Sequence, residues 1–167
     1  MYIPIILATG RKGRQSEKVA SFVYGKTDFD SEIIDVRDWA KPVTERYPED
    51  QKELKKKFEK ADGFIIVSPE YNSGYPGELK ILLDTFLSEY KDKKVGIIGV
   101  SAGSFGGVRM IEKLRPVLIN LGLNPISSMV TSKNVGDLFK DGKCQDEDYS
   151  RFVDEFLSDL KSKIKNK

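Results

Sequence analysis

The sequence predicts an α/β fold in which helices cover both faces of a parallel sheet of five strands. Three observations support this prediction. Five short apolar runs are bounded by turn residues, which is typical of strands buried on both faces. Segments with the spacing of amphipathic helices separate these runs. The two kinds of segment alternate five times along the chain, and this alternation indicates a parallel sheet connected by right-handed helical crossovers.

The expected strands are the five apolar runs themselves. The first four are nearly continuous in their apolar character, and the fifth is weaker. They comprise residues 3–8, 33–36, 63–68, 95–100 and 125–130.

A helix is expected after each strand. Ser16 is a candidate N-cap for the first helix, which would run to about residue 24 and turn Phe22 inward. The second is highly charged and weakly amphipathic around Leu54 and Phe58. The third carries an apolar stripe at helical spacing, and Ile81 lies off this stripe. The stripe comprises Leu79, Leu82, Leu83, Phe86, Leu87 and Tyr90.

The last two helices are expected on either side of the fifth strand. Pro116 is predicted to kink the fourth helix, because proline removes a backbone donor and clashes with the preceding turn. The segments 40–48 and 131–145 are expected to be the longest irregular pieces. The apolar face of the fifth helix is predicted to comprise Tyr149, Phe152, Val153, Phe156, Leu157, Leu160 and Ile164.

The length and composition are typical of one folded domain covering residues 1–167. Hydrophobic residues make up 39% of the chain and charged residues 32%, which excludes a disordered protein. No apolar run approaches the ~20 residues of a membrane-spanning helix, and the N-terminus lacks a signal-peptide pattern. The net charge of +2 is spread among acidic residues and gives no sign of nucleic-acid binding. We therefore expect a cytoplasmic protein without nucleic-acid or membrane partners.

Two absences restrict the chemistry. The chain has no histidine and a single cysteine, Cys144, so Ser-His-Asp and Cys-His catalysis are excluded in their usual forms. The common zinc sites are excluded as well, and no metal is expected. The chemistry must therefore come from carboxylates, hydroxyls, amines, backbone groups or a bound cofactor.

The site is expected in the loops that follow the strands, because open parallel sheets bind ligands beyond the carboxyl ends of their strands. Residues 9–16 read TGRKGRQS and combine two hydroxyls, two glycines and three cations before a helix N-terminus. Free backbone N–H groups and the helix dipole favour a phosphate there. The sequence is neither a Walker loop nor GxGxxG. Residues 101–107, SAGSFGG, are a weaker signal, since a glycine-rich loop can also be a tight turn.

The loop at residues 68–80, SPEYNSGYPGELK, carries the most specific motif. It resembles the P-E-Y-N-x-x-x-P-G-x-L-K signature of the NADPH-dependent FMN reductase family, with ATGRKGRQS similar to its G-S-x-R-x-x-S phosphate loop and SAGSFGGVR similar to its S-A-G-x-x-G-G-x-R segment. The resemblance covers nearly the whole chain. It implies a flavodoxin-like three-layer sandwich with strand order 2-1-3-4-5, a noncovalent FMN, and a homodimer or homotetramer. The chain departs from the pattern at Ala8-Thr9, where Gly-Ser is usual, and at Ile81, where asparagine is frequent.

The same resemblance implies the cofactor-binding residues. Those holding the phosphate would be Thr9, Arg11, Arg14, Gln15 and Ser16. Those lining the flavin ring would be Pro69, Glu70, Tyr71 and Asn72 on one side, and Ser101, Gly103, Gly106 and Gly107 on the other. Arg109 is expected either to reach a phosphate of the nicotinamide nucleotide or to pair with a carboxylate across a subunit interface, and the salt bridge is favoured because arginines on helices usually form them. From the residues themselves, Gly74 and Gly77 are expected to permit turns or close approach in the PEYN loop, and Asn72 is expected to satisfy loop backbone groups or to adopt the left-handed conformation.

The implied activity is an NAD(P)H-dependent reductase. Hydride would pass from NAD(P)H to flavin N5 and then to a small acceptor by a ping-pong mechanism, the acceptor being a quinone, azo dye, metal oxyanion or free flavin. Basic residues favour NADPH over NADH. Two alternatives remain open: an electron carrier of the flavodoxin type, although such carriers are typically strongly acidic, and a flavin-binding regulatory module. A phosphatase would need a nucleophilic Cys or Asp in residues 9–16, which contain neither.

Overall fold

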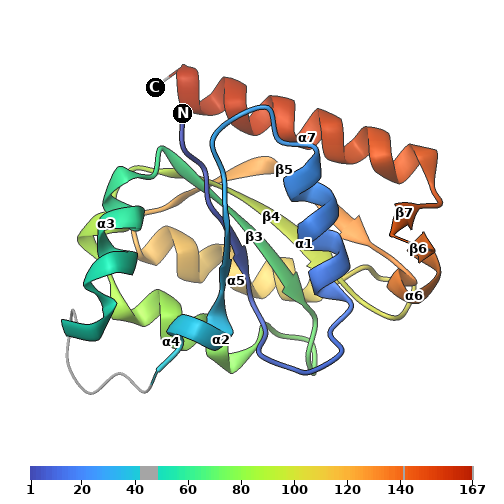
Figure 1. Cartoon of the computed structure of the whole chain (residues 1–167), viewed down its shortest axis with the longest axis horizontal. Coiled ribbons are helices and arrows are strands. Elements are labelled where there is room, and N and C mark those ends of the chain that lie inside the picture. Colours follow the sequence, from blue (N-terminus) through green and yellow to red (C-terminus); the bar gives the residue numbers. More distant parts are fainter. Residues whose placement is uncertain (42–48, 141, 167) are drawn as a thin grey trace.

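The core of the molecule is a five-stranded sheet in the order β2-β1-β3-β4-β5, in which all neighbouring strands are parallel (Figure 1). The computed structural model describes residues 1–41, 49–140 and 142–166. The strands are β1 (Ile5–Leu7), β2 (Ile33–Asp35), β3 (Gly63–Pro69), β4 (Lys94–Val100) and β5 (Asn124–Ser132). Both the five predicted strands and their predicted order are confirmed.

Helices lie on both faces of this sheet, as predicted (Figure 1). One face packs against α1 (Ser16–Gly25) and α7 (Glu147–Lys165). The other packs against α3 (Lys52–Lys60), α4 (Gly77–Thr85) and α5 (Val108–Asn120). Successive residues of a strand point to opposite faces, so each strand must be apolar on both sides to fill two cores. This requirement explains the continuous apolar runs.

Two details of the predicted helices differ from the structure. Helix α1 begins at Ser16, but Gln15 occupies the N-cap position and no side chain caps the helix. Helix α4 ends at Thr85, because the next residue, Phe86, has extended backbone angles. The predicted stripe therefore does not continue as one helix: Leu87 is 43% exposed, and Tyr90 lies in the separate short helix η2 (Ser88–Tyr90).

Phe152 does not belong to the buried face of α7, although the other six predicted residues do. Its side chain is 52% exposed and lies at the margin of the apolar stripe. Together with Met129 it lines a groove of about 750 Å³ beside the edge strand β5. Within the described residues no strand pairs with the outer side of β5, so a residue at the margin stays in solvent.

Residues 131–145 are more ordered than predicted. Strand β5 extends to Ser132 and is followed by α6 (Val135–Leu138). Two short antiparallel strands then form a hairpin, β6 (Phe139–Lys140) and β7 (Lys143–Cys144). The predicted irregular segment at 40–48 falls largely on 42–48, outside the described residues. The remaining short elements are α2 (Val36–Trp39) and η1 (Glu49–Gln51).

Pro116 lies inside α5, and the kink expected there stays a prediction. Within the described ranges, every helix is too short or too polar to cross a lipid bilayer. That residues 1–167 form a single domain stays a prediction.

Candidate functional site

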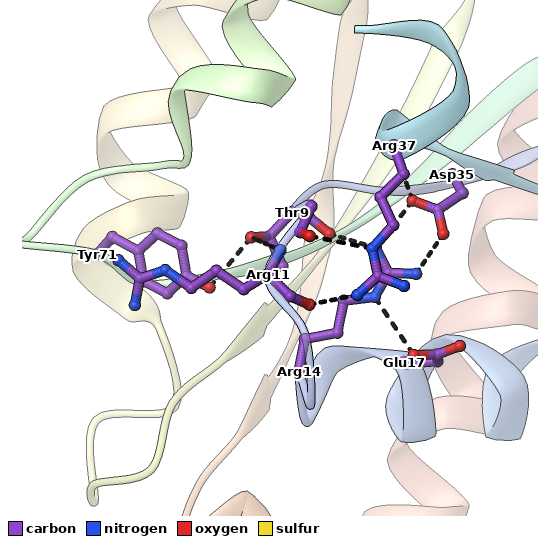
Figure 2. Close-up of polar contacts among 8 residues, drawn as sticks. Thr9, Arg11, Arg14, Glu17, Asp35, Arg37 and Tyr71 are labelled. Atoms are coloured by element: carbon purple, nitrogen blue, oxygen red, sulfur yellow. Dashed lines mark hydrogen bonds and ion pairs between the residues drawn. The ribbon is translucent and has the colours of Figure 1, made fainter.

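Polar side chains from neighbouring loops meet at the carboxyl edge of the sheet (Figure 2). The loops after β1 and β3 touch directly, since the hydroxyls of Thr9 and Tyr71 lie 3.0 Å apart. The loop after β3 also contacts the start of α5 through an ion pair between Glu70 and Arg109. A direct contact therefore joins the first two loops, and an ion pair connects the second loop to the helix that follows the third.

The first loop leaves several donors free at the N-terminus of α1. Within the described residues, the backbone N–H groups of Gly10, Lys12 and Gly13 have no acceptor. The hydroxyl of Ser16 is buried at the first residue of α1, and its Oγ has no partner among those residues either. A buried polar atom without a partner is costly, so each one calls for an explanation such as a bound ligand. The helix dipole adds positive potential at the same place.

Arg14 occupies a different position from the other basic residues of this loop. Its guanidinium is buried and forms a two-armed ion pair with Asp35, the last residue of β2, with one arm 2.8 Å from Oδ1. It also donates to the carbonyl of Thr9, and its Nε lies 3.4 Å from the carboxylate of Glu17. The structure thus places Arg14 in contact with protein groups. Gln15, by contrast, is exposed.

Arg11 extends from the loop in the opposite direction, to the ring of Tyr71 (Figure 2). The guanidinium carbon lies 3.7 Å from the ring centroid, a favourable cation–π distance. Arg11 is exposed, whereas Thr9 is fully buried. The tyrosine therefore links the loop after β3 to the phosphate-loop candidate by its hydroxyl and by its ring.

The PEYN loop makes its turn without using glycine for the left-handed positions. The backbones of Tyr71 and Gly74 exchange two hydrogen bonds of 2.9 Å. The two residues between them, Asn72 and Ser73, have φ angles of 50° and 61°, the combination found in a type I′ turn. Neither Gly74 nor Gly77 has a positive φ, so the left-handed positions of the turn are Asn72, as expected, and Ser73. Asparagine tolerates this conformation better than most residues, which accounts for Asn72.

The same loop offers fewer free donors than the sequence suggested. Pro69 ends β3 and has no N–H, while the N–H of Glu70 donates to Val100 at 2.9 Å. The N–H of Tyr71 donates to Gly74. Among the four predicted ring-lining residues, Asn72 therefore has the N–H that remains without an acceptor in the described residues.

Glu70 and Arg109 form an ion pair within one chain, so the salt-bridge role expected for Arg109 is met without a partner subunit. The carboxylate side chain is only 6% exposed, whereas that of Arg109 is 55% exposed. One oxygen of Glu70 accepts from the arginine, and the other, Oε2, is buried without a partner in the described residues. Among the described residues, Glu70 thus adds a second buried polar atom without a partner, in the loop after β3.

The glycine-rich loop is held mostly by its own backbone. The hydroxyl of Ser101 donates to the carbonyl of Gly103 at 2.9 Å. Gly106 and Gly107 have φ angles of 60° and 84° and are buried. Gly107 packs directly on β4, where a Cβ would lie 2.6 Å from the backbone nitrogen of Val100, and Gly106 packs on β5, where a Cβ would lie 2.7 Å from the Cβ of Thr131. Close approach between backbones explains these two glycines.

Sequence reasoning missed Asp35, Arg37 and Gly99. Asp35 is the last residue of β2 and forms the ion pair with Arg14. Arg37 donates to the carbonyl of Gly10, at 3.0 Å, and to that of Arg11. An acidic residue directly after an apolar strand was the available signal, since the loop after β2 reaches the same edge of the sheet. Gly99 lies opposite the glycine pair, and nothing in its local sequence indicated this contact.

The Arg14–Asp35 pair sets the electrostatics of this edge. Partial burial alone would raise the pKa of Asp35, but hydrogen bonds from Arg14 and from the backbone N–H of Arg37 outweigh it. The pKa of Asp35 therefore lies below its usual value. The hydrogen bond to Asp35 raises the pKa of Arg14. Both groups are charged at neutral pH.

Solved structures with the same fold include flavoproteins. FerB, a flavoenzyme NAD(P)H:(acceptor) oxidoreductase from Paracoccus denitrificans, superposes with a TM-score of 0.85 at 21% identity, covering 99% of this chain and 97% of that one. Oxidised flavodoxin from Bacillus cereus has a TM-score of 0.64 at 17% identity, covering 97% and 98%. At these identities the likeness establishes the fold alone, and the predicted flavodoxin-like fold is confirmed.

Sequence comparisons narrow the family. An NAD(P)H-dependent FMN reductase of Schizosaccharomyces pombe is 33% identical over 130 residues, which are 69% of this chain and 64% of that protein. An NADPH azoreductase of Bacillus sp. is 28% identical over 153 residues, 86% of this chain and 85% of that one. The chain thus spans less than two thirds of the yeast relative. The family model of NADPH-dependent FMN reductases matches residues 1–137. The chain therefore belongs to the NADPH-dependent FMN reductase family.

Proposed function

We propose that the chain binds FMN at the carboxyl edge of the sheet and uses it to transfer electrons from NAD(P)H to a small acceptor. The single observation that carries the proposal is the buried, unpartnered hydroxyl of Ser16 at the N-terminus of α1. It lies in a loop whose backbone N–H groups at Gly10, Lys12 and Gly13 have no acceptor in the described residues. A dianionic phosphate would satisfy these donors together.

The residues present fit the rest of this cofactor. The ring-lining set predicted from the sequence lies beside the first loop, and Asn72 keeps a free N–H within the described residues. When bound, FMN supplies the hydride acceptor and donor chemistry that the side chains of this chain lack. This division of labour agrees with the absence of histidine from the sequence.

The protein's own groups would position the cofactor and hold its phosphate. Thr9 and Ser16 supply hydroxyls, and Arg11 supplies a positive charge on a side chain that can leave Tyr71 for the phosphate. The Glu70–Arg109 pair stiffens the junction between the second and third loops. Ser101, Gly103, Gly106 and Gly107 form the opposite wall. We assign Arg14 to the loop's support, in place of the direct phosphate contact expected from the sequence.

The electron acceptor we propose is a quinone, an azo dye, a metal oxyanion or free flavin, taken up after the nicotinamide leaves the same site. Relatives named for azo and quinone substrates support this class: the NADPH azoreductase above and a 2-hydroxy-1,4-benzoquinone reductase of Burkholderia sp.. Parallel lines in double-reciprocal plots would support this ping-pong order. NADPH as the preferred donor, a homodimer or homotetramer and a cytoplasmic location stay predictions.

The test is a visible absorbance spectrum of the purified protein after incubation with FMN, before and after anaerobic addition of NADPH. We expect bound oxidised flavin, and bleaching of its longest-wavelength band once NADPH is added. Bound flavin that NADPH and NADH both fail to bleach would favour the electron carrier or the regulatory module. A protein that retains no flavin would overturn the proposal. Riboflavin, which lacks the phosphate, is the matched control and should bind more weakly than FMN.

A further inference from the structure

Three consecutive carbonyls of the first loop each accept a hydrogen bond from a guanidinium. Arg14 donates to the carbonyl of Thr9. Arg37 donates through Nε to the carbonyl of Gly10, at 3.0 Å, and through a terminal nitrogen to that of Arg11. Figure 2 shows both arginines on the same side of the loop, away from Tyr71. The carbonyl oxygens of residues 9–11 are therefore held toward the two guanidinium groups.

This arrangement fixes where the adjoining N–H groups point. In a planar trans peptide, the C=O of one residue and the N–H of the next point in opposite directions. Holding the carbonyls of residues 9–11 toward the arginines therefore turns the N–H groups of residues 10–12 the other way. The N–H of Arg11 lies 3.4 Å from the hydroxyl of Thr9, and those of Gly10 and Lys12 have no acceptor in the described residues. Successive N–H groups that face one concavity form an anion-binding nest. The nest would be set before any phosphate arrives, which reduces the ordering cost of binding.

Asp35 anchors both arginines. Its carboxylate accepts two hydrogen bonds from the buried guanidinium of Arg14. It also accepts from the backbone N–H of Arg37 at 2.9 Å, and thereby caps the short helix α2. One carboxylate at the end of β2 thus fixes one guanidinium directly and places the other through the backbone that carries it.

We propose that Asp35 is a positioning residue for phosphate binding, which orients the first loop through Arg14 and Arg37. The proposal rests on the proposed FMN function, because it names the residue that prepares the phosphate subsite. Asp35 does not contact the phosphate in this scheme. Its charge is of the wrong sign for a phosphate ligand, so its effect must pass through the two arginines.

The competing explanation predicts the opposite sign. If Arg14 were a direct phosphate ligand, Asp35 would draw it away and add a negative charge near a dianion. Removing that charge would then tighten FMN binding or leave it unchanged. If Asp35 organises the loop, removing the charge weakens FMN binding. The direction of the change therefore separates the two explanations.

The test uses the flavin-free full chain with the substitution Asp35→Asn, titrated with FMN and with riboflavin. We expect FMN affinity to fall about tenfold, because asparagine removes the negative charge and one of the two oxygens that accept from Arg14. Riboflavin affinity should change by no more than about twofold, since the ring subsite lies apart from the substitution. Asp28→Asn is the matched control: Asp28 pairs with Lys161 beyond the other end of α1 and should leave both affinities unchanged.

Unchanged or tighter FMN binding by the Asp35→Asn protein would overturn the proposal, and so would equal losses for FMN and riboflavin. Failure of the unsubstituted chain to bind FMN would instead overturn the proposed function. Should Asp35→Asn fail to fold, Arg37→Gln replaces it, because Arg37 is exposed and tolerates substitution. This variant should also lose FMN affinity selectively, and it should lower the rise in Tm that inorganic phosphate gives the flavin-free protein.

Discussion

The two edges of the sheet treat their polar side chains differently. At the amino edge, the hydroxyl of Tyr2 donates to Glu32 at 2.6 Å, and Lys57 donates to the other oxygen of Glu32 at 2.6 Å. The backbone N–H of Tyr2 donates to Asp62 at 2.7 Å. At the carboxyl edge, Ser16 has a buried side-chain oxygen without a partner in the described residues. The Glu32 network is closed by its own hydrogen bonds, whereas Ser16 in the first loop keeps a hydroxyl without a partner in the described residues.

This contrast predicts that the Glu32 network contributes to stability and that the first loop contributes to binding. In a paired polar network, hydrogen bonds within the protein offset the free energy of desolvation. For an unpaired buried group, this free energy is offset only when a ligand binds. Substitutions at the two edges should therefore separate into two classes. Those at the Glu32 network should change stability alone, and those at the first loop should change FMN affinity.

The largest effect should come from the carboxyl edge itself, at Gly107. A Cβ there meets the backbone of β4, and the φ of 84° strains any other residue. We expect Gly107→Ala to lower the free energy of unfolding by about 3 kcal/mol, measured by urea denaturation. Gly103→Ala, in the same loop but with open space around it and no positive φ, should lower it by less than about 0.5 kcal/mol. Similar losses for both variants would contradict the role given to close backbone approach.

Two substitutions with smaller effects should distinguish the contributions of the two edges to stability and to FMN affinity. Tyr2→Phe removes a hydrogen bond to a carboxylate and should lower the free energy of unfolding by about 1 kcal/mol, with FMN affinity unchanged. Ser16→Ala removes a hydroxyl that has no partner among the described residues. The unfolding free energy of the flavin-free protein should therefore stay within about 0.5 kcal/mol, while FMN affinity falls about tenfold. Urea denaturation and FMN titration of both variants provide the measurements. A stability loss in Ser16→Ala without an affinity loss would reverse the assignment.

The smallest effect concerns pH. Burial alone would raise the pKa of Glu32, but hydrogen bonds from Lys57 and Tyr2 lower it below its usual value. A carboxylate with a lowered pKa in the folded state contributes stability above its ordinary pKa, and this contribution is lost as the pH falls through the folded-state pKa. We expect the free energy of unfolding to decline as the pH falls below about 4, near the ordinary pKa of glutamate. Glu32→Gln should flatten this decline, as followed by denaturation at several pH values. An unchanged slope would show that Glu32 does not contribute.

The sequence predicted the sheet well because its signal is local. A strand buried on both faces must be apolar at every position. Residues 63–68 and 95–100 could therefore be predicted as strands without knowing which strands lie beside them. The strand order and the family came from motifs at known loops, and both are confirmed. The predicted burial of Leu87 and Phe152 was wrong, and the two errors have the same cause. Periodicity gives the direction of a side chain only while the helix continues and the surface opposite is covered.

The candidate site was predictable in its location and less so in its internal contacts. Three loops were chosen because parallel strands end at one edge, and the Thr9–Tyr71 contact joins two of them. The partner of Arg14 could not be read from residues 9–16, because Asp35 is twenty-one positions away and is brought close by strand pairing. A basic loop looks the same in sequence whether its arginines face a ligand or a carboxylate.

The alternation of side chains along β3 has a consequence for how the chain can change over time. Ile65 packs in the layer beneath α1 and α7, and its neighbour Ile66 packs in the layer beneath α3, α4 and α5. Adjacent residues of β3 therefore pack against separate sets of partners. A lineage can rebuild one layer by compensating substitutions while the other is inherited intact. The loops at the carboxyl edge contact both layers, so substitutions in either layer must remain compatible with the structure of these loops.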